Sequence, residues 1–191
     1  MYVSGFDLDL EINSARKKIG YCPQENALYE NLTVREHLRF YGRVKGMPKS
    51  ILNEDVELKI KTLDLELHAS KLAGTLSGGN KRKLMMAIAL MGNPEILLSD
   101  EPSAGVDPVA RKFMWSVISK LAADKHSTVV LSTHSMEECE ALCTQTIIMT
   151  SGVFRTINTN HGIKAEYAQG YELYVKFGRD ENRKEELKKT N

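Results

Sequence analysis

The sequence lacks several features that mark special classes of protein. Its longest apolar run is eight residues, Leu84 to Met91, whereas a helix that spans a bilayer needs about 20. Its first residues show no basic segment followed by an apolar one, so a secretory signal is not predicted. The net charge is only +1, so no bulk electrostatic attraction to nucleic acid or to an anionic membrane is expected.

Cysteine is also scarce. Three cysteines in 191 residues do not make a disulfide framework, which favours reduced thiols in the cytosol. Hydrophobic residues make up 42% of the chain and charged residues 27%, as is ordinary for a globular protein, and the length suffices for one domain with a sizeable core. Function must therefore be sought in the motifs.

Hydrophobic periodicity and turn residues divide the chain into helices and strands. Thr33 with Glu36 and Ser135 with Glu138 have the spacing of capping boxes, and Asp107 before Pro108 predicts a helix start. Helices are predicted over residues 32–46, 50–63, 79–91, 107–122 and 136–143. Strands are predicted over residues 1–8, 95–102, 127–134, 146–150, 153–157 and 170–177.

Strands and helices that alternate at this spacing predict an α/β fold with a mostly parallel sheet. Residues 30–75 are almost wholly helical and interrupt the alternation, so we expect a helical subdomain inserted at roughly residues 30–90. The α/β domain is expected to cover residues 1–177, with a charged tail over residues 178–191.

Polar side chains follow two of the apolar strands. Asp100 and Glu101 end one strand and His134 ends the next, and the carboxyl edge of a parallel sheet is where ligands bind. In nucleotide hydrolysis a first acid holds Mg²⁺ and a second can orient the attacking water. Gln24 follows an earlier apolar segment, and its amide can touch Mg²⁺ or that water. The alternatives are turn acids, a structural histidine and a surface glutamine.

A second pattern lies at the start of the apolar helix. Ser77, Gly78 and Gly79 provide a hydroxyl and bare backbone N–H groups at a helix N-terminus, where an anion such as phosphate binds well. The alternative is a flexible loop before a buried helix. The cations that follow, residues 81–83, are most simply interpreted as a solvated helix face.

In this order the motifs resemble the nucleotide-binding domain of ATP-binding cassette (ABC) proteins, and most of all the A subfamily of ABC transporters. Gln24 matches the Q-loop and His134 the switch histidine. The signature, the Walker B segment and the D-loop match LSGGN (76–80), ILLSDE (96–101) and SAGVD (103–107). The resemblance covers about residues 1–177 and implies a P-loop NTPase core.

The resemblance also implies the ligands and the roles at the sheet edge. The expected cofactors are ATP and Mg²⁺. Asp100 would contact Mg²⁺, Glu101 would act on the hydrolytic water and His134 would contact the γ-phosphate. Gln24 would contact the Mg²⁺ and the nucleotide and couple the site to transmembrane helices.

The signature would serve a second nucleotide. Ser77, Gly78 and Gly79, with Asp107 of the D-loop, would approach the ATP held by the opposite domain of a head-to-tail dimer. The expected partners are therefore a second nucleotide-binding domain and the transmembrane domains of a transporter, at the cytoplasmic face of a membrane. No nucleic acid is expected, and lipid is the substrate that the A subfamily suggests by analogy.

One part of the family pattern is absent. The family has a G-x-x-x-x-G-K-[ST] loop upstream of Gln24 that cradles the phosphates, and Gly-Lys occurs nowhere in this sequence. We therefore expect a partial domain, without the N-terminal strands and the P-loop, that is inactive alone. Loss of the P-loop strand would leave two neighbouring strands without a partner. Smaller departures are Ser99, where the family favours an apolar residue, and Asn80, where many cassettes have glutamine.

Three interpretations stay open. The chain is a fragment of a transporter cassette, a regulatory module that lends its signature to another chain's ATP, or an ABC ATPase that is not a transporter. Only 52 residues separate Gln24 from Ser77, too few for the long coiled coil of the chromosome-maintenance type. A translation factor would carry two signatures, and one is present.

Overall fold

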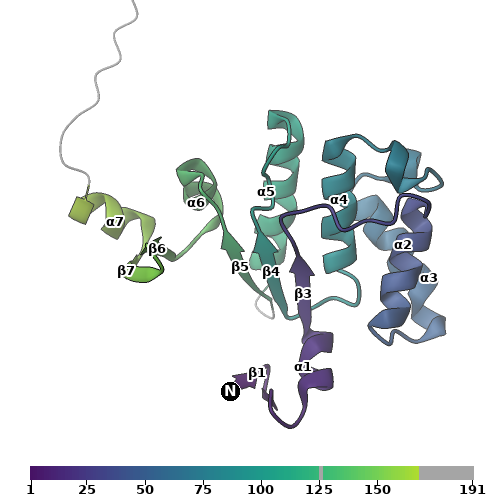
Figure 1. Cartoon of the computed structure of the whole chain (residues 1–191), viewed down its shortest axis with the longest axis horizontal. Coiled ribbons are helices and arrows are strands. Elements are labelled where there is room, and N and C mark those ends of the chain that lie inside the picture. The colour runs from purple at the N-terminus through teal and green to yellow at the C-terminus, as the bar shows by residue number, and fades with distance from the viewer. Residues whose placement is uncertain (125–126, 168–191) are drawn as a thin grey trace, which may run out of the picture. The chain divides into compact units, whose positions relative to one another are not determined.

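The structure, a computed structural model, describes residues 1–124 and 127–167 (Figure 1). The chain divides into two compact units, residues 1–144 and 145–191. Each is described by itself below. The predicted strand over residues 170–177 and the charged tail lie outside the described residues.

A parallel sheet forms the centre of the first unit, with the strand order β3-β4-β5. The strands are β3 (Ile19–Cys22), β4 (Ile96–Asp100) and β5 (Thr128–Ser132). Ile96 lies opposite both Ile19 and Thr128, so all three strands run in register to one edge (Figure 1). Helix α5 (Pro108–Ala122) connects β4 to β5 as the crossover that parallel strands require.

Two short strands precede this sheet, where one strand was predicted. β1 (Tyr2–Val3) pairs antiparallel with β2 (Phe6–Asp7), and α1 (Ile12–Lys18) leads into β3. The turn between them is Ser4–Gly5, and both residues have positive φ. This is the backbone that a two-residue hairpin turn needs, so the chain folds back there.

The connection from β3 to β4 is almost wholly helical. Its elements are α2 (Val34–Val44), α3 (Lys49–Thr62), the 3₁₀ turns η1 (Glu66–His68) and η2 (Ala73–Thr75), and α4 (Gly78–Ala89). Helix α4 packs against β3 and also against α2 and α3. Each residue of the apolar run 84–91 is at most 9% exposed, so this run is the core that joins the helices to the sheet. The predicted limits of the helical subdomain and of the whole domain stay predictions.

The first predicted capping box is present at α2. Thr33 Oγ1 accepts from the backbone N–H of Glu36, and the Glu36 carboxylate accepts from the N–H of Thr33 at 2.8 Å. The second box, at α6 (Met136–Leu142), is half formed: Ser135 Oγ accepts from the Glu138 N–H, but the Glu138 carboxylate instead accepts from Trp115 Nε1 at 2.8 Å. A tertiary hydrogen bond has replaced the local one.

The strand predicted over residues 127–134 is shorter than expected. β5 ends at Ser132, because the chain then turns and the N–H of Ser135 donates to Thr133 Oγ1. His134 therefore lies in the turn after the strand and not on it.

The second unit begins with the predicted hairpin. β6 (Thr146–Thr150) pairs antiparallel with β7 (Val153–Asn158) around Ser151 and Gly152, which both have positive φ. Helix α7 (Asn160–Tyr167) follows. In the described part of the chain β6 pairs with β7 alone and β5 with β4 alone, so each of these two strands has one open edge.

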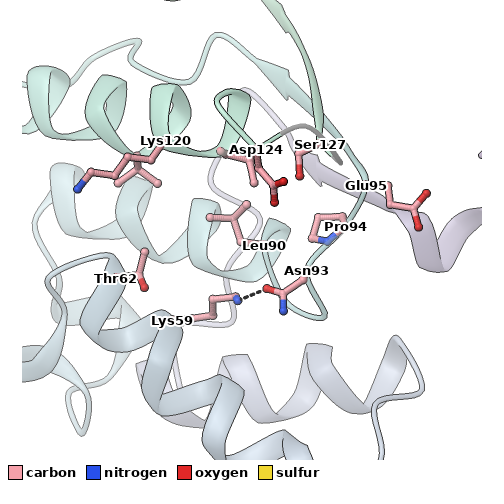
Figure 2. A pocket seen from close by; sticks show the side chains of 11 residues that line it. Lys59, Thr62, Leu90, Asn93, Pro94, Glu95, Lys120, Asp124 and Ser127 are labelled. Atoms are coloured by element: carbon pink, nitrogen blue, oxygen red, sulfur yellow. Dashed lines mark hydrogen bonds between the residues drawn. The ribbon is translucent and has the colours of Figure 1, made fainter.

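A buried polar network holds the end of α4. Lys59 Nζ donates to Asn93 Oδ1 at 2.6 Å (Figure 2). It also donates to Asp55 Oδ1 at 2.9 Å, and Asp55 Oδ2 accepts from the Gly92 N–H at 3.1 Å. Asp55 and Lys59 are only 7% and 5% exposed. Helix α3 thereby fixes the turn that leads from α4 into β4.

Replacing Lys59 tests this network. Lys59→Met should lower the free energy of unfolding by about 3 kcal/mol, because it leaves the buried Asp55 carboxylate without its cation. Lys61→Met, on the exposed face of the same helix, should change it by less than about 0.5 kcal/mol. The measurement is urea denaturation of the two variants. Equal midpoints would show that the buried pair of Lys59 and Asp55 does not hold the turn after α4.

Candidate nucleotide site

The carboxyl edge of the sheet brings three of the predicted residues into contact. Glu101 follows β4. Its carboxylate accepts a hydrogen bond from Gln24 Nε2 at 3.3 Å and lies 3.1 Å from His134 Nδ1. Gln24 follows β3 and His134 follows β5, so each of three adjacent strands delivers one of the groups. The Glu101 side chain is 25% exposed and that of His134 is 77% exposed, so the site is open to a ligand.

Asp100 lies one residue before Glu101, at the end of β4. Its Oδ1 accepts a hydrogen bond from the Ser132 hydroxyl. The same Ser132 accepts from the Glu101 N–H, at 3.1 Å through its carbonyl and 3.2 Å through its hydroxyl. The backbone of Glu101 is left-handed, with φ of +45°, which is strained for a residue with a side chain. The bonds to β5 hold that strained turn and fix where the two acids point.

Arg82 is a buried residue beneath the candidate site that the sequence did not reveal. It is 3% exposed, so the interpretation of residues 81–83 as a solvated face is wrong for it. Its guanidinium donates to the backbone carbonyls of Pro23, Gln24, Asp100, Glu101 and Pro102, at 2.6–2.9 Å. One side chain from α4 therefore ties together the loops after β3 and β4.

Lys83 is also buried, at 9% exposure. It lies over the ring of Phe113, 4.5 Å from the centroid, and donates to Asp64 Oδ2 at 2.8 Å.

Beside the Walker B strand, burial raises the pKa of the Cys22 thiol, and nearby Arg82 opposes that rise. Burial thus favours the neutral thiol of Cys22, which lies in the hydrophobic core.

The glycine-rich segment lies elsewhere on the first unit. Ser77 caps α4, where its hydroxyl accepts from the Asn80 N–H at 3.3 Å, and Asp107 caps α5 through the N–H groups of Val109 and Ala110. These residues line a pocket of about 290 Å³, together with Gly79, Asn80 and Lys83. None of Gln24, Asp100, Glu101 or His134 lines it. The structure therefore separates the predicted residues into two surfaces, linked through α4 by Arg82.

Gly78 occupies the first position of α4 and faces open space. A Cβ atom there would meet nothing within 4 Å, and one on Gly79 would only touch Ala110, Asp107 and Val106 at ordinary distances. The fold of this chain therefore does not require either residue to be glycine.

A larger hollow lies at the other end of the sheet. It has a volume of about 460 Å³, and Figure 2 shows Lys59, Asn93 and Pro94 beside it. Glu95 and Ser127, which precede β4 and β5, also line it. It contains none of the residues that the motifs identify, so we place the candidate site at the opposite edge.

Comparison with known proteins assigns the family. Residues 2–104 match the family model for ABC transporters. The chain belongs to this family. It is 43% identical to the phospholipid-transporting ATPase ABCA3 of Mus musculus over 92% of this chain and 10% of that protein. It is 45% identical to the retinal-specific phospholipid-transporting ATPase ABCA4 of Homo sapiens over 91% of this chain and 8% of that one. The chain spans about a tenth of the length of these relatives.

Solved structures agree on the fold. The ATP-binding subunit of an ABC transporter matches with a TM-score of 0.74 and 27% identity, over 86% of this chain and 68% of that one. A dimeric ATP-binding cassette bound to ADP and Pi matches with a TM-score of 0.72 and 24% identity, over 83% and 72%. The expected P-loop NTPase fold and the resemblance to the A subfamily are confirmed. The roles of the individual site residues stay predictions.

Within residues 1–124 and 127–167, no helix is long and apolar enough to cross a membrane.

Exchange of Arg82 tests whether it organises the site. Arg82→Lys should lower the free energy of unfolding by about 3 kcal/mol, because an ammonium group cannot reach five carbonyls as the guanidinium fork does. The control Lys81→Met, on the more exposed side of the same turn, should stay within about 0.5 kcal/mol of the parent. The measurement is urea denaturation. If Arg82→Lys is as stable as the control, Arg82 does not organise the site.

Proposed function

We propose that this chain is the ATP-binding part of an A-subfamily ABC transporter that moves phospholipid across a membrane. The observation that carries the proposal is the meeting of Gln24 and His134 at the carboxylate of Glu101. An amide and an imidazole on either side of one carboxylate suit the positioning of a water against a terminal phosphate. The named activities of ABCA3 and ABCA4 support phospholipid as the substrate class.

In this proposal the sheet edge serves hydrolysis. Glu101 orients the attacking water and His134 contacts the γ-phosphate. Asp100 and the amide oxygen of Gln24 are hard oxygen donors, which fit Mg²⁺, and the phosphates and waters would complete its coordination. When bound, the ion neutralises phosphate charge. Ser132 holds the Asp100 carboxylate in place for it.

The signature surface serves a second nucleotide. Ser77, Gly78 and Gly79 would approach the ATP bound by the opposite domain of a head-to-tail dimer, with Asp107 at the same pocket. The dimeric state of the cassette that matches in fold makes such a partner reasonable. The other partners would be transmembrane domains, which would place this chain at the cytoplasmic face of a membrane.

The chain is expected to be inactive as an ATPase by itself. Positioning provides most of the catalysis in phosphoryl transfer, and these 191 residues contain no Gly-Lys for a phosphate-binding loop. Purified chain should therefore release phosphate from Mg-ATP no faster than its Glu101→Gln variant. Steady turnover that disappears in Glu101→Gln would contradict this.

A second candidate function follows from the separation of the two surfaces. None of Gln24, Asp100, Glu101 or His134 lines the signature pocket, which supports a chain that lends its signature to a P-loop on another molecule. Mg-ATP should then make the chain associate with an intact A-subfamily cassette that carries its own glutamate-to-glutamine change. Association is measured by sedimentation velocity with and without nucleotide.

Two variants separate the surfaces in that assay. Ser77→Arg should abolish the ATP-dependent association, because a bulky side chain fills the approach of the phosphates. Glu101→Gln should leave the association unchanged, because the glutamate acts on a nucleotide held by the P-loop of its own domain and not on the one held by the partner. If ATP makes no difference, or if Ser77→Arg pairs as well as the parent, the chain does not act as a signature donor.

A further inference from the structure

Helix α6, which follows His134, is tied to α5 at two neighbouring acids. Glu138 is 1% exposed and accepts from Trp115 Nε1 at 2.8 Å. Glu137 lies 3.4 Å from the guanidinium of Arg111, whose Cζ lies over the Trp115 ring at 5.4 Å. Arg111 and Trp115 are four residues apart and so share a face of the helix. One face of α5 therefore holds the start of α6.

The position of the His134 ring depends on the turn between β5 and α6. Its side chain is 77% exposed, so packing does little to fix the ring, which lies 3.1 Å from the Glu101 carboxylate. On either side of His134, the Ser135 N–H donates to Thr133 Oγ1 at 3.0 Å. This bond closes the turn and sets the direction in which the His134 side chain leaves the backbone.

The Ser135 N–H has a second acceptor within its own helix. In a capping box the N–H of the N-cap residue donates to the carboxylate three residues later, which here is Glu138. An N–H that points at that carboxylate cannot also point at Thr133 Oγ1, because a good hydrogen bond is nearly linear. Since the Trp115 indole engages the carboxylate, the Ser135 N–H is left for Thr133.

We propose that Trp115 is a positioning residue for His134. By binding the Glu138 carboxylate it prevents the local capping box, keeps the turn closed on Thr133 and so holds the imidazole against Glu101. Trp115 acts through Glu138 and the turn rather than on the nucleotide. This rests on the proposed role of His134 at the γ-phosphate, and it places the origin of that role on the crossover helix α5.

Nuclear magnetic resonance of the His134 imidazole in the purified chain tests the proposal. The signal is assigned by its loss in His134→Gln, and Glu101→Ala shows where it lies when the contact is broken. Trp115→Phe keeps a ring but loses the N–H donor, so Glu138 is released to the Ser135 N–H. The signal should then move at least about half of the way to its position in Glu101→Ala, because one hydrogen bond to a charged group changes the balance of two turns about tenfold.

A double variant separates positioning from loss of packing. Glu138→Ala removes the competing acceptor, so the Ser135 N–H stays with Thr133. The His134 signal should therefore keep its parent position in Glu138→Ala and also in the combination of Glu138→Ala with Trp115→Phe. If the double variant moves the signal as far as Trp115→Phe does, Trp115 acts by packing and the proposal is overturned.

The same turn can be changed without touching α5. Thr133→Val removes the acceptor of the Ser135 N–H, so it should move the His134 signal in the same direction as Trp115→Phe, and it decides the proposal if Trp115→Phe does not fold. Lys112→Met, at an exposed position of α5, is the control and should leave the signal in place. A signal that Thr133→Val leaves unmoved would contradict the proposal.

The indole reports on its own hydrogen bond. The chain has one tryptophan, so the Trp115 Nε1–H gives a single signal. Its exchange with solvent should be about tenfold faster in Glu138→Ala than in the parent. In Glu138→Gln, whose carbonyl can still accept, it should stay within about threefold of the parent. Equal exchange in Glu138→Ala and the parent would remove the bond on which the proposal stands.

These measurements need no nucleotide, so they separate the positioning role from the proposed function. A His134 signal that responds to Glu101→Ala but not to Trp115→Phe overturns the positioning role alone. If the parent and Glu101→Ala share one signal position, the contact that carries the proposed function is absent, and the positioning role fails with it.

Discussion

The buried guanidinium of Arg82 is the interaction on which both surfaces of this chain depend. It leaves α4 four residues after the first signature glycine and binds carbonyls on both loops that carry Gln24, Asp100 and Glu101. A charge that is 3% exposed is costly unless its donors are used, and here all three of its nitrogens donate. The helix that presents the signature therefore cannot shift without moving the loops at the sheet edge.

This arrangement suggests how the two surfaces communicate. A ligand that presses on Ser77 or Gly79 acts on the N-terminus of α4, and Arg82 lies one turn further along the same helix. The loops at the other end of its hydrogen bonds hold the carboxylate that Gln24 and His134 contact. Any coupling along this route would pass through one helix and one side chain, α4 and Arg82.

Much of the fold and part of the site could be predicted from the sequence. Thr33 and Asp107 mark their helices by local capping. The apolar strands that precede Glu101 and His134 predict a shared edge because parallel strands finish together. Arg82 could not be predicted, because Lys81, Arg82 and Lys83 form one charged run and its partners are backbone carbonyls that leave no mark on the sequence. The positive φ of Glu101 and the Trp115–Glu138 bond were missed for the same reason: each is set by tertiary contact.

Hydrogen exchange tests the central claim most directly, namely that the signature surface of this chain meets a nucleotide held by another cassette. The chain is mixed with an intact A-subfamily cassette that carries the glutamate-to-glutamine change, with and without Mg-ATP. The account predicts ATP-dependent protection of the amides at residues 78–83, which spreads through Arg82 to the loop at residues 100–102. Exchange that ATP does not alter, or protection at the sheet edge without any at residues 78–83, would contradict it.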